Sequence, residues 1–107
     1  MTNAGDRKQT EATIPIDAAG ETVELDMHGA TLLSVAIRGD AAADYVLDVQ
    51  LDRQSDWIQD HIDTTLTGAA DYDTTVETGM PNVRVRVTSG TGTGGDEATI
   101  TMSAGGG

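Results

Sequence analysis

Apolar and polar residues alternate along much of this chain, which is the pattern of half-buried β-strands. Every second residue of 22–27 is apolar, and the segment 83–88 (Val-Arg-Val-Arg-Val-Thr) repeats the alternation more strictly. Near the end of the chain Ala98, Ile100 and Met102 share one strand face. The pattern therefore predicts β-structure for most of the sequence.

Two further segments predict strands of different kinds. Residues 12–16 contain Pro15, which cannot donate to a ladder, so this segment is predicted to be an edge strand. Residues 31–38 form a more continuous apolar run, which is typical of a central strand.

The segment 40–63 can be read in two ways. Asp recurs at every fourth position from Asp40 to Asp60, which on a helix would form one acidic stripe. Such a stripe places like charges at i,i+4 and uses a poor helix former, so we interpret the segment as strand. The inward residues are then predicted to be Tyr45, Leu47, Val49 and Leu51. The outward residues are predicted to be Asp44, Val46, Asp48, Gln50 and Asp52.

Turn signals separate the remaining strands. We expect a turn at 53–56, a strand from Trp57 towards Leu66, a loop at 67–71, and a short strand at 74–76. A turn at 78–81 and a flexible glycine-rich hairpin loop at 89–95 complete the series. The sequence predicts an all-β fold, an antiparallel β-sandwich or jelly roll of about seven to eight strands.

Composition divides the chain into one domain and two short ends. Residues 1–11 are polar, and the charges of Asp6, Arg7, Lys8 and Glu11 cancel, so we expect a flexible N-terminal arm. The β-sandwich domain is predicted to span 12–104 and a glycine tail 105–107. Because the arm has no net charge, these four residues form a candidate assembly contact with a neighbouring molecule.

The net charge of −12 comes from 18 Asp and Glu against six Lys and Arg. An acidic chain that is poor in aromatic residues is often disordered, but the alternating strands argue for a fold. The low Lys content and the many Asp, Thr and Ala residues resemble proteins of salt-in halophilic archaea. No basic stripe is available to neutralise phosphates, so nucleic acid is not expected as a partner.

Several function classes find no support in the residues. The chain has no Cys and no apolar run of about 18 residues, and no signal peptide is visible, so no membrane partner is expected. His28 and His61 lack a Gly-x-Ser-x-Gly motif and are predicted to be surface residues. The glycine-rich 91–95 segment lacks the Lys-Ser/Thr ending of a phosphate loop. We expect no enzymatic activity, no catalytic residues and no cofactor.

Two acidic segments and two arginines are candidate binding groups. Residues 52–56 and 71–73 do not match the spacing of an EF-hand loop, so we assign no metal site. Arg84 and Arg86 project from one strand face, and pairing with Asp residues on neighbouring strands is expected rather than binding of an acidic ligand.

Trp57 is the only Trp and the chain has no Phe. It is predicted to anchor the core or its edge, and the alternative is an exposed residue that contacts a surface or stacks on a sugar. Under this alternative, Trp57 is the candidate surface or glycan contact.

The order of these features resembles small β-sandwich virion proteins of tailed viruses. The features are the strand, turn and Trp of 45–57, Thr78-Gly79, the strand 83–88 and the glycine-rich hairpin into 98–102. Decoration, turret, fibre and tail proteins share the pattern. The resemblance implies a structural protein located in the virion of a haloarchaeal tailed virus, on the capsid as a decoration or turret component. Its expected partners are copies of itself, as a homo-oligomer, and other virion proteins. The alternative function is a carbohydrate- or surface-binding β-sandwich module.

The charge leads to a first prediction. Thermal melts in KCl from roughly 0.1 to 2 M should show a strongly rising melting temperature, because the Debye length shrinks from about 10 Å towards 3 Å and relieves self-repulsion. A melting temperature that is indifferent to salt would contradict the halophilic interpretation.

Overall fold

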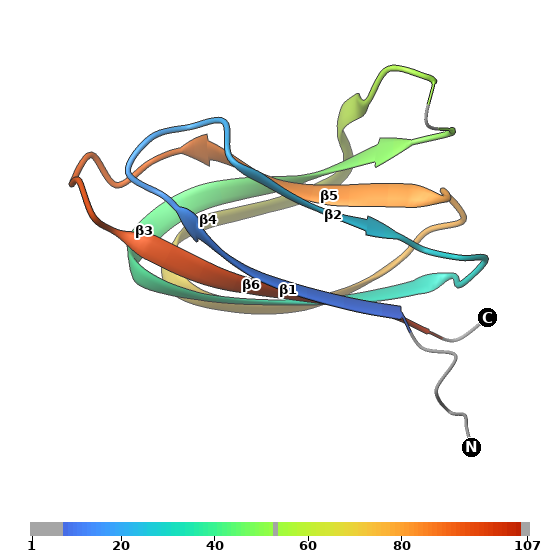
Figure 1. Cartoon of the computed structure of the whole chain (residues 1–107), viewed down its shortest axis with the longest axis horizontal. Helices are drawn as coiled ribbons and strands as arrows, with labels where there is room; N and C mark the ends of the chain where they lie inside the picture. Colours follow the sequence, from blue (N-terminus) through green and yellow to red (C-terminus); the bar gives the residue numbers. More distant parts are fainter. Residues whose placement is uncertain (1–7, 53, 106–107) are drawn as a thin grey trace.

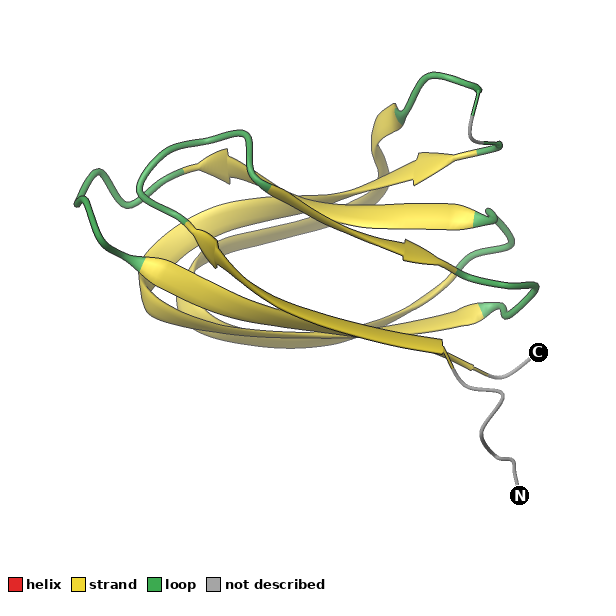
Figure 2. Ribbon diagram, viewed as in Figure 1, coloured by secondary structure: helices red, strands yellow, loops and turns green. Residues whose placement is uncertain are grey.

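A computed structural model describes residues 8–52 and 54–105, with side chains apart from Lys8 and 60–69. This part of the chain contains no helix (Figure 2). Its six strands all pair antiparallel, which confirms the predicted all-β fold. They are β1 (Lys8–Pro15), β2 (Thr22–Asp26), β3 (Leu32–Gln50), β4 (Ile58–Glu77), β5 (Asn82–Ser89) and β6 (Glu97–Gly105).

The strands form one continuous sheet that folds over on itself. Their order is β1-β6-β3-β5-β2, and β4 lies along the other side of β3. The first part of β3, residues 32–39, pairs with β6, whereas 44–50 pairs with β5. Figure 1 shows β3 and β4 curving together around one end of the molecule, and β1 and β2 at the two ends of the order contact each other. The result is a sandwich whose two halves nearly close into a barrel.

The two long strands account for the difference between six observed strands and the expected seven to eight. β3 spans 19 residues and β4 spans 20, and each contributes to both halves of the sandwich. Counted by halves, they would be four strands rather than two.

The bend in β3 requires close approach of the backbones. The register between β3 and β4 shifts between Arg38 and Ala43. At Gly39 in this bend, a Cβ atom would lie 3.1 Å from the Ala70 carbonyl oxygen. Only glycine lets β4 follow the turn of β3 at this separation without displacement of a neighbour.

The core lies between the two halves and is built by alternation. Val83, Val85 and Val87 of β5 are fully buried, as are Ile100 and Met102 of β6. Further core residues come from the other strands and their connections, and include Ile14, Ile16, Val23, Leu25, Met27, Leu33, Val35, Ile37, Tyr45, Leu47 and Val49. Val, Ile, Leu and Met side chains thus supply most of the packing in the absence of Phe.

The predicted facing of the second half of β3 is partly wrong. Leu51 lies beyond the strand end and is 62% exposed, although it was expected in the core. Val46, Asp48 and Gln50 were expected to face solvent and are buried. They point away from the core, but the side chains of Asn82, Arg84 and Arg86 of β5 lie beside them on this outer face.

Three predicted boundaries also move. Residues 67–71 were expected to be a loop and are part of β4, because they continue its pairing with β3. Residues 8–11, placed in the arm, form the first half of β1 and pair with β6. Gly105, placed in the tail, is the last residue of β6. Asp6 and Arg7 lie outside the described residues.

The connections at one end of the sandwich are tied together by backbone hydrogen bonds. The amide of Thr91 donates to the Ile16 carbonyl at 2.9 Å, and that of Gly92 to the Asp17 carbonyl at 3.0 Å. A Cβ atom on Gly90 would overlap the backbone of Asp17 and Ala18. This close approach couples the β5–β6 loop to the β1–β2 loop.

We therefore expect Gly90→Ala to lower the free energy of unfolding by about 1–3 kcal/mol, since the added methyl group forces the two loops apart. Urea denaturation at constant KCl measures the change. Gly94→Ala is the matched control, because a Cβ there meets nothing within 4 Å. Equal stabilities of the two variants would show that the loops can separate at no cost.

Candidate functional site

A buried carboxylate lies on the outer face of the β2-β5-β3 half. Asp48 of β3 is opposite Arg84 of β5 in the sheet register and has no exposed surface. The Nε atoms of Arg84 and Arg86 donate to Asp48 Oδ2 at 2.7 and 2.8 Å. Nη2 of Arg86 also donates to Asp48 Oδ1 at 3.3 Å. The expected pairing of the two arginines with a neighbouring Asp is therefore confirmed.

Trp57 covers this cluster from the β3–β4 turn. The guanidinium carbon of Arg84 lies 4.4 Å from the centroid of the Trp57 ring, which is a cation–π contact. The Trp57 side chain is partly exposed and does not belong to the core cluster. It therefore packs at the surface over a charged group, and one face of the ring is occupied by Arg84.

A polar row beside the cluster fixes the same turn. Asn82 Nδ2 donates to Gln50 Oε1 at 3.2 Å, and Gln50 Nε2 donates to the Ser55 carbonyl at 2.8 Å. Within the turn, the Ser55 amide donates to the Asp52 carbonyl at 3.0 Å. The turn is thus tied to the outer face of the sheet by side-chain hydrogen bonds.

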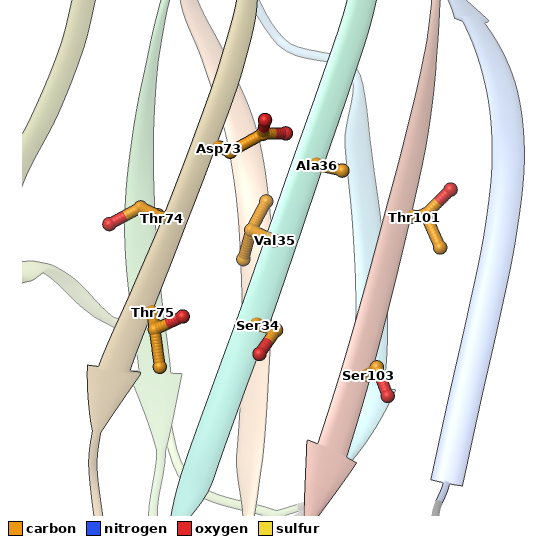
Figure 3. Close-up of a pocket in the computed structure, with 8 residues that line it drawn as sticks. All are labelled: Ser34, Val35, Ala36, Asp73, Thr74, Thr75, Thr101 and Ser103. Carbon is orange, nitrogen blue, oxygen red and sulfur yellow. The ribbon is translucent and has the colours of Figure 1, made fainter.

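The opposite face of the molecule carries a shallow groove of about 500 Å³. Figure 3 shows Ser34 and Ala36 of β3 between the side chains of β4 and those of β6. Ser34 is opposite both Thr75 and Ser103, and Ala36 is opposite both Asp73 and Thr101. The groove exists because Ser34 and Ala36 of the central strand have smaller side chains than Asp73, Thr75 and Thr101 beside them. The lining residues are Ser34, Val35, Ala36, Asp73, Thr74, Thr75, Thr101 and Ser103.

The one charged lining residue is neutralised by a neighbour. Nη1 of Arg38 lies 2.8 Å from Asp73 Oδ1, and its Nη2 donates to Oδ2 at 3.0 Å. The hydrogen bond to Arg38 lowers the pKa of the Asp73 carboxyl and raises the pKa of the guanidinium. Both side chains are more than half exposed. Arg38 therefore balances the charge of Asp73, while Asp71, its neighbour across the strands, and Glu11, beside Thr101, leave the surroundings of the groove acidic.

The remaining candidate residues lie apart from one another. Glu11 is on β1, where its Oε1 accepts a hydrogen bond from Thr101 at 3.1 Å, next to the groove. Lys8 begins β1. His28 is exposed, as expected, with Nδ1 3.3 Å from Asp26. The side chain of His61 lies outside the described part.

Several of the described titratable groups pair with one another. The side chains described at 9–52, 54–59 and 70–105 include no group of three or more His, Asp or Glu that could hold a metal ion. Of the two acidic segments considered earlier, Asp52 Oδ1 accepts from the Gln54 amide at 2.8 Å, and Asp73 pairs with Arg38. Burial raises the pKa of the Tyr45 phenol, so this group stays neutral in the core. Among these residues there is no helix long and apolar enough to span a membrane.

Sequence reasoning missed the burial of Asp48 and the groove. The signal for the first was Val46, an apolar residue at an outward position two residues before Asp48. The groove depends on which strands lie beside β3, and the sequence does not show this pairing.

We expect Asp48→Asn to lower the free energy of unfolding by about 3–5 kcal/mol, because two largely buried guanidinium groups lose their counter-charge. Denaturation in urea at constant KCl measures the loss. Asp73→Asn removes the exposed partner of Arg38 and should leave stability almost unchanged. Similar losses of unfolding free energy in both variants would show that the buried Asp48 cluster contributes no more stability than an exposed ion pair.

Comparisons with known proteins show the fold alone. No protein-family model matches the chain, and no curated protein is significantly similar in sequence. Among solved structures, the chain is similar to the crystal structure of the SPBc2 prophage-derived protein YomS, with a TM-score of 0.61 and 16% sequence identity. The match covers 91% of this chain and 93% of that chain, so the two proteins have the same architecture over nearly their whole length.

Proposed function

We propose that this protein is a non-enzymatic structural component of the virion of a haloarchaeal tailed virus, on the capsid surface as a decoration or turret component. The observation that carries the proposal is the similarity in fold, over more than nine-tenths of both chains, to a prophage-derived protein. This similarity in fold agrees with the resemblance in sequence, because the order of strands and turns also resembles virion proteins. The similarity in fold supports a viral origin of this protein more directly than it supports a location on the capsid.

The charged residues support a structural role. A catalytic carboxylate or arginine needs access to substrate in a pocket. Here Asp48 is closed off by Arg84 and Arg86, and Asp73 is held by Arg38 on an open surface. The Asp48 cluster stabilises the sheet, and the groove beside Asp73 is lined mainly by hydroxyl and methyl groups, which are poor acid–base catalysts.

The charge supports a halophilic origin. A domain with a charge of −12 repels itself at low ionic strength, and molar salt screens most of this repulsion. A virion protein of a virus that infects a salt-in archaeon folds in a cytoplasm with molar salt. The released particle then remains at high salt concentration. Its partners in the proposal are copies of itself and other virion proteins.

The alternative, a carbohydrate-binding module with Trp57 at its site, has less support. Sugars stack on an open aromatic face, whereas Arg84 already occupies one face of the Trp57 ring. The part-burial of Trp57 further limits the area left for a ligand.

Purified virus particles test the proposal. On a density gradient in molar salt, the protein should migrate with the major capsid protein at a fixed copy ratio, measured by quantitative mass spectrometry. Immunogold labelling should then place it on the capsid rather than on the tail. An acidic host protein of similar abundance, which should be lost from the gradient fraction, is the control. Recovery only in the soluble cell fraction would overturn the proposal.

A further inference from the structure

β4 is a long free edge of the sheet. It spans 20 residues, and within residues 8–52 and 54–105 the only strand that pairs with it is β3. Figure 3 shows Asp73 and Thr75 of β4 on one side of β3, and Thr101 and Ser103 of β6 on the other. An edge strand presents unpaired backbone groups, to which another chain can add a strand.

The ladder between β3 and β4 shows which backbone groups face the edge. The amide of Thr78 donates to the Thr31 carbonyl at 2.9 Å, so these two residues form a hydrogen-bonded pair. In an antiparallel ladder such pairs alternate with pairs that exchange no hydrogen bond, and the register continues without a shift as far as Asp71. The backbone N–H and C=O groups that point away from β3 are therefore those of residues 71, 73, 75 and 77.

The side chains of 71–77 give this edge an acidic outer face and an apolar inner face. The residues whose backbone groups point to the edge are all exposed, and they are Asp71, Asp73, Thr75 and Glu77. Tyr72 and Val76 alternate with them on the inner face and pack in or against the core. Arg38 pairs with Asp73 only, so the outer face of this edge keeps a net negative charge.

This charge favours a basic strand as the occupant of the edge. A second copy of this chain would bring the same acidic row against the first, and like charges directly opposite each other destabilise a strand pair. A strand with Lys or Arg opposite Asp71, Asp73 and Glu77 gains opposite-charge pairs instead. Apolar residues between its basic residues would lie beside Tyr72 and Val76 and extend the core.

The fold already contains one strand of this kind. β5 alternates buried valines with Arg84 and Arg86. Both arginines donate to Asp48 of the neighbouring strand β3. Alternation of apolar and basic residues is therefore compatible with pairing beside an acidic strand in this sheet.

We propose that the free edge of β4, at 71–77, binds an extended segment of another protein in which Lys or Arg alternates with apolar residues. The segment adds an antiparallel strand through the backbone groups of residues 71, 73, 75 and 77, and its basic side chains lie against the acidic outer face. Backbone hydrogen bonds supply affinity, and the alternating side chains supply specificity. The proposal goes beyond the virion role and does not depend on it, since purified protein alone tests it.

A labelled peptide as long as 71–77, in which Arg and Val alternate, is the probe. Fluorescence anisotropy at a constant KCl concentration should show saturable binding to wild type. Thr75→Pro removes an amide that points to the free edge, while the hydrogen bonds between β3 and β4 remain, so this variant should lose binding. Thr75→Val keeps the amide and is the matched control, which should bind as wild type does.

A charge reversal tests the acidic row and does not depend on the folding of Thr75→Pro. The variant that combines Asp71→Lys with Glu77→Lys should bind the Arg peptide at least about tenfold more weakly. The same variant should bind a peptide in which Glu and Val alternate, which wild type should not bind. Circular dichroism checks that each variant folds.

A modified peptide separates strand addition from attraction to a protein of charge −12. N-methylation of the Arg amides keeps the charge of the peptide and removes the donors that would face β4, so this peptide should not bind. Equal binding of the two Arg peptides, or equal binding by wild type and folded Thr75→Pro, would overturn the proposal. Absence of binding to wild type would also overturn it, because the acids would then only prevent pairing. Light scattering tests the other occupant: a dimeric wild type and a monomeric Thr75→Pro would show that the edge pairs with a second copy, against the proposal.

Discussion

The fold depends on the bend in the middle of β3. This strand pairs directly with β4, β5 and β6, while β1 and β2 join the sheet only through β6 and β5. Between Arg38 and Ala43 the chain advances five residues, whereas its partner β4 moves only from Asp71 to Ala69. The additional residues of β3 form the bend. Because Ile37 and Ala43 are both buried, the corner preserves the inward face, and one strand can line the core from both sides.

The Asp48 cluster shows how the outer face of one half is closed without a covering layer. Burying a lone carboxylate is costly, and the cost is offset only when charge and hydrogen bonds are both supplied. Arg84 and Arg86 supply both, and Trp57 shields Arg84 from water. A buried pair is screened far less by salt than an exposed one. The cluster therefore contributes nearly constant stability across the salt range in which the surface acids change their repulsion.

The sequence predicted the strands well where one face meets the core and the other meets water. It identified 83–88 and 98–102 because alternation there matches burial residue by residue. It failed at 67–71, where Gly and Ala indicate a loop locally but the pairing with β3 imposes a strand. The prediction failed at Asp48 because alternation distinguishes the two faces of a strand but does not show whether the outer face is exposed to solvent. The groove was out of reach, since it depends on the register of three strands that lie far apart in the sequence.

A shared fold at 16% identity has a physical explanation that also limits what the fold can say about function. A sandwich of this kind needs inward apolar residues at period two and room for close backbone approach at corners such as Gly39. Many sequences satisfy these conditions, and the outward residues are left to vary. The fold therefore constrains the inward residues and leaves the outward residues, on which function depends, unconstrained. One outer face is closed by a buried ion cluster, and the other has a groove over small side chains. The outer faces can therefore change in sequence without loss of the fold, so a shared sandwich does not by itself imply a shared function.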